Sequence, residues 1–213
     1  TWTYTNTKYW PEGNPVSFVA YYPNLTTAPT ITDGATAIPF TVKNDATEQV
    51  DFMWSTVKAA TKDDKNGTAI NGITNTKISF KAKLGEASYS GVTIKVKSIK
   101  INGVKNKGTF TIPADLTAGT WATEDAATND YTVSETNGKE IASTTADSIG
   151  ESLLMIPQDM KGKTIEIAYD LVYTNPTQTI SNTKAIVLDD KSNWVMNQQY
   201  TYTLTISLET VQL

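Results

Sequence analysis

The segment QYTYTLTISL at residues 199–208 decides the fold class of this chain. Threonine or serine alternates there with apolar side chains, which stand at Tyr200, Tyr202, Leu204, Ile206 and Leu208. Successive side chains of a β-strand point to opposite faces, so the alternation predicts a strand with one buried and one exposed face. The apolar face has to be buried against other strands.

The same alternation recurs along the chain. It predicts further strands around Val16–Tyr22, Ile78–Leu84, Val92–Val96, Leu153–Ile156 and Ile165–Tyr173. Helical periodicity is nearly absent, and only residues 50–60 are compatible with a turn or two of helix. Strands at short spacing with loops between them predict an all-β fold built from β-sandwiches.

Two local features interrupt the strand pattern. The apolar phase shifts by one residue between Val96 and Ile99, which predicts a β-bulge near Ser98. Asparagine followed by glycine adopts the positive φ that tight hairpins require. We therefore expect hairpin turns at Asn71-Gly72, Asn102-Gly103 and Asn137-Gly138.

The most polar stretch of the chain is TKDDKNGTAINGITNT at residues 61–76. Domain boundaries fall in exposed linkers that are rich in glycine and polar residues. We therefore expect a partial N-terminal sandwich at residues 1–70 and a larger C-terminal sandwich at residues 71–213.

Composition removes most catalytic chemistry. The 213 residues include no His, no Cys and no Arg, so all 18 basic residues are Lys. Zinc-type sites, Ser-His-Asp triads and Cys nucleophiles therefore have no basis. The net charge of −4 disfavours a nucleic-acid partner. Threonine, about one residue in six, favours strands, and a sequence rich in threonine and asparagine with few charges suits an extracellular surface.

Carboxylates are the remaining candidates for catalysis. They form doublets in predicted loops, at Asp63-Asp64, Glu124-Asp125 and Asp189-Asp190. Neighbouring side chains of an extended chain point apart, whereas a glycosidase needs two carboxylates that face each other across a cleft. The segment KDDKNGT also lacks the ligand spacing of a calcium loop. We therefore predict that the chain is not an enzyme and uses no cofactor and no metal.

No segment approaches the roughly 18 apolar residues of a membrane span, and no charged-then-apolar leader is present. We expect a chain without a membrane span, from which any export signal has been removed.

Two groups of side chains are candidates for contact with other molecules. Alternating lysines suit anionic glycans, but outward lysines also keep a sheet soluble and block edge pairing; they are Lys77, Lys81, Lys83, Lys95 and Lys97. Aromatic side chains crowd the first 22 residues, where they either hold sugars or form core; they are Trp2, Tyr4, Tyr9, Trp10, Tyr21 and Tyr22.

Residues 9–23 read YWPEGNPVSFVAYYP, and this motif resembles the fimbrillin family of the Bacteroidales, the Mfa-like pilins and fimbria-associated surface proteins. Further family motifs follow in the family's order and extend the resemblance over nearly the whole chain. They are VDFMWS at 50–55, KISFKAKLGEA at 77–87, VKSIKINGVKNKGTFT at 96–111, LLMIPQ at 153–158 and SNWVMNQQYTYTLTISL at 192–208.

The resemblance implies a fold of tandem transthyretin-like Greek-key sandwiches, export as a lipoprotein, and a place in a fimbrium at the outer membrane. It also implies that a protease cuts behind an Arg and removes the first strand. The groove left behind then receives a terminal strand from another pilin subunit, which is β-strand addition. Host or bacterial surface proteins or glycans are further partners that a surface location suggests.

Two other function classes stay open at this point. The segment YTVSETNGKE at Tyr131–Glu140 is similar to a strand of Gram-positive collagen-adhesin domains, which form Lys-Asn isopeptide bonds. The aromatic cluster near the N-terminus is the feature that supports a carbohydrate-binding module.

Assembly is expected to involve the strand at Tyr200–Leu208, either as a wall of the acceptor groove or as the donor. Where the chain's own sandwich buries that strand, the donor is the segment Glu209–Leu213, with Val211 and Leu213 as the side chains that fill pockets.

Overall fold

The computed structural model describes residue 9, residues 11–61 and residues 72–213. It confirms the all-β prediction, because strands account for nearly all the regular structure and the one helix of the described residues is a short 3-10 turn, η1 (Ala46–Glu48). The strands are β1 (Val16–Tyr22), β2 (Thr30–Thr32), β3 (Ala35–Thr41), β4 (Met53–Ala60), β5 (Gly72–Ile73), β6 (Thr76–Leu84), β7 (Val92–Lys105), β8 (Lys107–Ile112), β9 (Thr120–Thr123), β10 (Thr128–Ile141), β11 (Asp147–Met155), β12 (Thr164–Thr174), β13 (Thr177–Val187), β14 (Gln199–Ile206) and β15 (Val211–Gln212).

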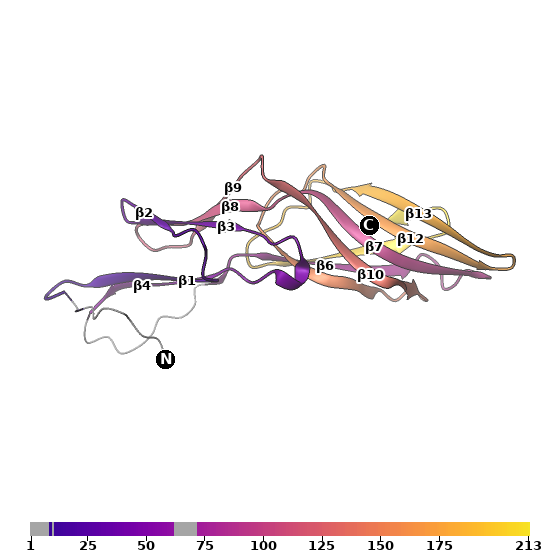
Figure 1. The fold of residues 1–213 in the computed structure, drawn as a ribbon, viewed down its shortest axis with the longest axis horizontal. Coiled ribbons are helices and arrows are strands. Elements are labelled where there is room, and N and C mark those ends of the chain that lie inside the picture. The colour runs from indigo at the N-terminus through magenta and orange to yellow at the C-terminus, as the bar shows by residue number, and fades with distance from the viewer. Residues whose placement is uncertain (1–8, 10, 62–71) are drawn as a thin grey trace.

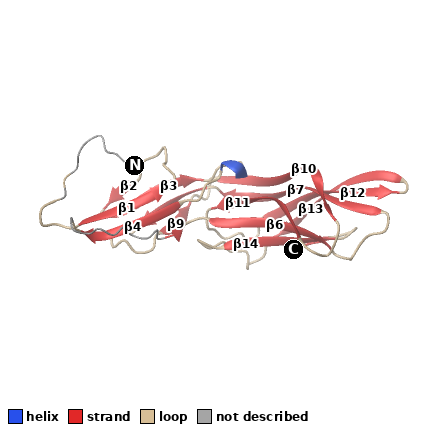
Figure 2. Ribbon diagram, turned by 90° about the horizontal axis from the view of Figure 1, so that it is seen from below, coloured by secondary structure: helices blue, strands red, loops and turns tan. Residues whose placement is uncertain are grey.

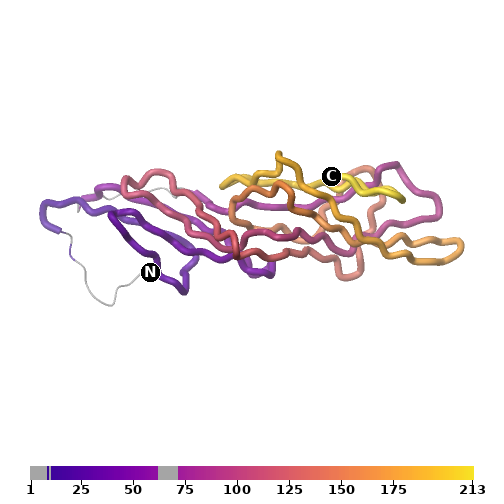
Figure 3. The backbone as a smooth tube through the Cα atoms, turned by 90° about the horizontal axis from the view of Figure 1, so that it is seen from above, coloured from indigo at the N-terminus to yellow at the C-terminus, as the bar shows by residue number. Residues whose placement is uncertain are grey.

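The molecule is elongated, with two sheets in each half (Figure 1). One half pairs β1-β4-β5 with β2-β3-β8-β9, and we call it the first half. The other half pairs β10-β7-β12-β13 with β11-β6-β14-β15, and we call it the second half. The turn η1 lies between the halves (Figure 2), and the tube in Figure 3 shows that the C-terminus belongs to the second half.

Aromatic rings fill the core of the first half. Phe52 stacks on Phe40 with ring centroids 5.1 Å apart, and it meets Phe110 edge-on at 5.6 Å. Trp121 closes the cluster at 5.4 Å from Phe110. Offset and edge-to-face rings stabilise a core by about 0.5–1.5 kcal/mol per pair beyond their buried area. This packing joins the two sheets, because Phe52 precedes β4 whereas Phe40 and Phe110 lie on β3 and β8.

The second half is a four-on-four sandwich whose strands follow the predicted alternation. Along β6 the side chains of Ile78, Phe80, Ala82 and Leu84 are buried, and the lysines between them face outward. The strand β14 pairs with β6 in parallel over its full length, from Gln199–Lys77 to Ile206–Leu84. A parallel pair needs a long connection, and here most of the second half lies between the two strands in sequence.

The predicted bulge near Ser98 is confirmed. Ser98 pairs with Ser134 and Val96 pairs with Lys139, so β10 carries extra residues between these two pairs. Ser98 also pairs with Ala168, and the next pair joins Val96 to Tyr169, which leaves Lys97 as the extra residue of β7.

Two of the predicted hairpin turns are wrong. Asn102-Gly103 lies inside β7 and Asn137-Gly138 lies inside β10, each at a register shift of the β7–β10 pair. Gly103 and Gly138 do adopt positive φ, +65° and +71°. The positive φ serves a bulge in a long, continuous strand in place of a chain reversal. Asn71, in the third dipeptide, lies outside the described residues.

The stretch at 50–60 is strand β4 from Met53 to Ala60, so the expected turn or two of helix is absent there. Phe52, Trp54 and Thr56 are buried at alternate positions, which is the period of a strand. The core of the first half therefore overrides the weak helical pattern.

The division of the chain near residue 70 stays a prediction, and residues 62–71 lie outside the described residues. The sheet containing β2 and β3 also contains β8 and β9, which follow residue 70 in sequence. The segments on the two sides of the predicted boundary therefore share a sheet.

Gly150 provides a test of the bulged edge of the second half. It adopts φ +58°, and an added Cβ would lie 2.7 Å from the Cβ of Val133 on β10. We expect Gly150→Ala to lower the free energy of unfolding by about 2–4 kcal/mol, the sum of left-handed strain and overpacking. Gly162→Ala is the matched control, with φ +76° and no neighbour within 4 Å, and should cost about 1–2 kcal/mol. Urea unfolding curves measure both; equal losses would contradict the close approach of β11 and β10.

Candidate interaction sites

The predicted assembly strand forms β14 and the turn after it. Tyr202, Leu204 and Ile206 are buried in the sandwich of the second half, and Tyr200 is half-buried. The hydroxyl of Tyr202 accepts a hydrogen bond from Trp194 Nε1 at 2.9 Å, and its ring stacks on Phe80. The apolar face of β14 is therefore part of the chain's own core, while its role in assembly stays a prediction.

The C-terminal segment is held by few contacts. Val211 pairs with Ile206 and Gln212 pairs with Thr205, and these are the two residue pairs between β14 and β15. Ser207 and Thr210 close the turn between them through hydrogen bonds of 2.8–3.1 Å. The side chains of Leu208 and Leu213 are 38% and 49% exposed. This segment is the more readily released part of the predicted site.

A groove of about 580 Å³ lies beside β3, close to the junction of the two halves. It is lined by apolar side chains that include Leu25, Phe40, Val42 and Val50. Strand β2 pairs only with Ala35–Ala37, so among the described residues the rest of β3 has a strand partner on one side only, which is β8. An open strand edge beside apolar pockets is the geometry that accepts an added strand.

Charged residues stand at the rim of this groove and give it no net charge. The positive charges of Lys43 and Lys107 are balanced by the negative charges of Glu48 and Glu124. Lys107 Nζ is 3.6 Å from the Glu124 carboxylate. Pro39 lies within β3 and lacks a backbone N–H. Proline inside a sheet occurs mainly in strands that have an unpaired side. Sequence reasoning missed this groove, although Pro39 within an alternating apolar stretch was the signal for an edge.

The buried amide of Gln158 holds the end of β7 next to the junction of the two halves. Gln158 Oε1 accepts the Lys105 N–H at 2.8 Å, and Gln158 Nε2 donates to the Lys105 carbonyl at 2.9 Å and to the Ile156 carbonyl at 3.0 Å. Lys105 ends β7 in the second half, and β8 of the first half begins two residues later. The side chain thus pairs with the main chain as a neighbouring strand would.

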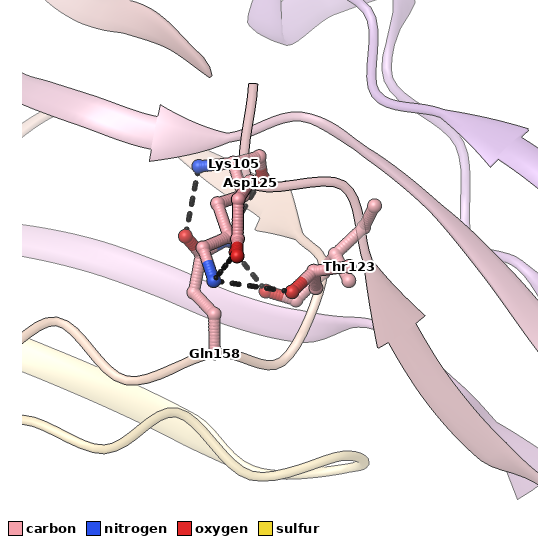
Figure 4. Close-up of polar contacts among 5 residues, drawn as sticks. Lys105, Thr123, Asp125 and Gln158 are labelled. Atoms are coloured by element: carbon pink, nitrogen blue, oxygen red, sulfur yellow. Dashed lines mark hydrogen bonds and ion pairs between the residues drawn. The ribbon is translucent and has the colours of Figure 1, made fainter. Parts of the chain in front are cut away.

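The side chain of Lys105 reaches the loop after β9 (Figure 4). Its Nζ lies 2.6 Å from Asp125 Oδ1 and 3.3 Å from Thr123 Oγ1. The hydrogen bond from Lys105, with its charge as the second cause, holds the pKa of Asp125 below its usual value. Gln158 lies at the end of the LLMIPQ motif, where a polar residue after a buried apolar run was the signal for its structural role.

Further side chains cross between the halves. Phe52 N–H donates to Asn75 Oδ1 at 2.7 Å, Leu154 N–H donates to Gln49 Oε1 at 2.6 Å, and Trp121 Nε1 donates to the Thr74 carbonyl at 3.1 Å. Two side-chain amides and one indole thus pair with main-chain groups near the junction of the two halves.

The five candidate lysines do not form one patch. Lys77, Lys81 and Lys83 lie on the outer face of β6, whereas Lys95 and Lys97 lie on β7, which belongs to the opposite sheet. Lys97 is also 3.9 Å from the Asp170 carboxylate. The five lysines therefore lie on two surfaces, because β6 and β7, although consecutive in sequence, belong to opposite sheets of the sandwich.

The carboxylate doublets point to separate partners where they are described. Glu124 lies near Lys107 and Asp125 near Lys105, while Asp189 accepts the Lys191 N–H at 3.0 Å. Asp63-Asp64 lies outside the described residues, as do Trp2, Tyr4 and Trp10 of the aromatic cluster. Of that cluster's other members, Tyr9 is 88% exposed, Tyr22 is 51% exposed and Tyr21 packs against the core.

The family model for fimbrillin-like proteins matches residues 1–213. The chain belongs to the fimbrillin-like family. This confirms the resemblance drawn from the sequence motifs. Among curated proteins no sequence matches this chain.

Solved structures share its fold. A fimbrial protein from Bacteroides vulgatus has a TM-score of 0.72 at 20% identity, over 100% of this chain and 80% of that one. A candidate cell adhesion protein from Bacteroides uniformis has a TM-score of 0.56 at 19% identity, over 99% of this chain and 75% of that one. A candidate cell adhesion protein from Bacteroides ovatus has a TM-score of 0.51 at 15% identity, over 100% of this chain and 70% of that one. In the described part of this fimbrillin, no helix has the length and apolar character to cross a membrane.

Truncating Gln158 tests how firmly the end of β7 is held. In Gln158→Ala the half-buried N–H and carbonyl of Lys105 lose their partners, so we expect the free energy of unfolding to fall by about 2–4 kcal/mol. Gln178→Ala, on the exposed strand β13, is the control and should change it by less than about 0.5 kcal/mol. Urea denaturation gives both values, and a loss below about 1 kcal/mol in Gln158→Ala would contradict the assigned role.

Stability should fall at alkaline pH. Burial raises the pKa of Tyr131 to about 12, from an ordinary value of 10.0, and burial also raises the pKa of Tyr202. A phenol whose folded pKa lies above its unfolded pKa stabilises the fold below pH 10, and that contribution is lost as pH rises from 10 to about 12. Urea midpoints across this range should therefore drop less steeply in Tyr131→Phe than in the wild type. Parallel curves would contradict the raised pKa.

Proposed function

We propose that this fimbrillin is a structural subunit of a cell-surface fimbria, or a fimbria-associated adhesion protein, and that it assembles by β-strand addition with other pilin subunits. Family membership over the whole chain supports the fimbrial role. The proposal includes export as a lipoprotein and a location at the outer membrane, and it assigns the chain no catalytic activity.

The observation that carries the assembly step is the apolar groove beside the open edge of β3. An incoming strand there gains main-chain hydrogen bonds from β3, and its alternate side chains enter the space lined by Leu25, Phe40 and Val50. Burial of each large apolar side chain contributes about 1.5–3 kcal/mol. The groove is therefore the acceptor in this proposal.

The donor in this proposal is the C-terminal segment Glu209–Leu213 of a neighbouring copy, together with any residues that follow it. Two residue pairs join β15 to β14, and Val211 packs against the core, so release of β15 uncovers one partly buried side chain. Release of β14 would instead expose Leu204 and Ile206, both 0% exposed. We accordingly propose that Tyr200–Leu208 stays in its own sandwich during assembly, and that Val211 and Leu213 enter the acceptor.

Donor and acceptor lie in different halves of the elongated molecule (Figure 3). A contact between two unlike surfaces that does not close on itself produces an open filament. This arrangement fits a head-to-tail fibre better than a closed dimer.

Assembly is tested with the full chain, a version lacking residues 209–213, and Val50→Asp. Val50 lines the groove and is 39% exposed, so the aspartate places a charge in the acceptor without disturbing the fold. We expect the wild type to form fibres or higher oligomers and both variants to remain folded monomers. Size-exclusion chromatography and negative-stain electron microscopy measure this, with circular dichroism as the check on folding.

Val187→Asp is the matched control, because Val187 is 66% exposed and lies on β13, away from the groove. It should assemble as the wild type does. Leu204→Lys and Ile206→Lys should lose the fold, since each buries an unpaired charge. Assembly that survives both the truncation and Val50→Asp contradicts the proposed donor and acceptor, and folded Lys variants contradict the core position of β14.

The Gram-positive adhesin alternative finds no support in the family match. It would instead be supported by an intact mass lower than the sequence mass by one ammonia, the signature of a Lys-Asn isopeptide bond.

A further inference from the structure

Two adjoining hollows form a polar trough on the outer face of the sheet β11-β6-β14. Their volumes are about 570 Å³ and 270 Å³, and they share Lys77, Glu151, Ser152 and Gln199. The larger hollow extends to Asp51 and Asn75 at the junction of the two halves. We call this surface the trough.

A bulge in β11 builds one wall of the trough. Between the pairs Ile149–Phe80 and Leu153–Ile78, β11 advances four residues while β6 advances two. Gly150 permits this bulge through its positive φ of +58°. Ser152 is fixed toward the floor, because its hydroxyl lies 2.9 Å from the hydroxyl of Ser79 on β6. Bulges of this kind redirect side chains next to functional sites.

The lining mixes donors and acceptors and is balanced in charge. Lys77 and Lys81 are offset by Asp51 and Glu151, so the net charge of the lining is zero. Hydroxyl groups complete the smaller hollow, on Ser79, Ser148, Ser152 and Thr201. At the opposite end Ile73, 36% exposed, and Leu154 add an apolar surface.

Asn75 contributes a donor that has no partner among the described residues. Its side-chain oxygen accepts the Phe52 N–H at 2.7 Å, which fixes the direction of the amide. The residue is 2% exposed, it lines the larger hollow, and Nδ2 makes no hydrogen bond. A buried unpaired donor costs about 1–3 kcal/mol, but Nδ2 has almost no accessible surface, so a ligand oxygen would pair with it only after the side chains around it move.

We infer that the trough binds a neutral oligosaccharide. Sugar hydroxyls both donate and accept, which matches a lining of amides, carboxylates, ammonium groups and hydroxyls with no net charge. The apolar C–H face of a sugar ring suits Ile73 and Leu154. A phosphate-bearing ligand is disfavoured, because the carboxylates of Glu151 and Asp51 beside the lysines would repel it. Among the described side chains no group of three or more acidic residues is arranged to hold a metal ion.

A peptide strand is a poorer occupant for a geometric reason. The trough lies on the face of the sheet, where the main-chain groups of β6 are already paired with β11 and β14. A ligand there has to be recognised by side chains. The inference therefore concerns the face of the β6 sheet, which shares Leu154 with the acceptor groove beside β3 but lies on another sheet. It rests on the surface location of the proposed function but not on strand addition.

The test uses the full chain on an array of maltohexaose, xylohexaose, mannohexaose and lacto-N-neotetraose, with a heparin hexasaccharide as the anionic probe. Glu151→Ala and Gln199→Ala each remove exposed groups of the trough. Glu140→Ala and Gln178→Ala are matched controls, exposed and outside both the trough and the proposed donor segment. We expect wild-type binding to at least one neutral oligosaccharide, weakened about tenfold by each trough variant and unchanged in the controls. Isothermal titration measures the affinities, and circular dichroism checks folding.

Three results would overturn the inference: no binding to any neutral probe, binding that both trough variants retain, or binding to heparin alone, which would indicate recognition of sulfate by lysine. Electron microscopy of the same samples separates this outcome from that of the assembly proposal. A chain that binds oligosaccharide without forming fibres would refute strand addition and support the trough as a binding site. Fibres without oligosaccharide binding would support strand addition and refute the inference about the trough.

Discussion

The double hydrogen bond between the Gln158 amide and the main chain of Lys105 fixes the point at which the chain passes from the second half into the first. Lys105 is the last residue of a strand in the second half, and β8 continues the same course into the first half after Asn106. The amide holds this crossing as a sheet neighbour would. Both proposed surfaces reach the junction of the two halves, because the groove beside β3 includes Lys107 and Gly108 and the trough extends to Asp51 and Asn75.

Much of the fold could be predicted because burial of one face of a strand produces an alternating sequence. The alternation in β6, β12 and β14 is strong because one face of each meets the core and the other meets water. Strand β13 has no such alternation. It is an edge strand, exposed at most positions on both faces, so its sequence TQTISNTKAIV lacks a period that reports its structure. The two hairpin predictions at the glycines of β7 and β10 were wrong because a positive φ is compatible with a hairpin turn and with a bulge alike.

What the sequence could not supply is the pairing of distant segments. The parallel neighbours β6 and β14 are separated by most of the second half, and the trough joins Asp51, Lys77, Glu151 and Gln199 from four parts of the chain. No local pattern links such residues. A glycine in a strand is a general signal for a bulge, and Gly150 beside Glu151 and Ser152 was the one local pointer to the trough.

The parallel pairing of β6 with β14 has a mechanical consequence. A pull on the C-terminus along the direction of β14 draws that strand lengthwise against β6, so the eight residue pairs from Gln199–Lys77 to Ile206–Leu84 resist together and do not open one after another. Forced unfolding depends on the rate at which such a barrier is crossed. Tension applied at the C-terminus would therefore meet shear resistance in the sheet before it reached the core of the sandwich.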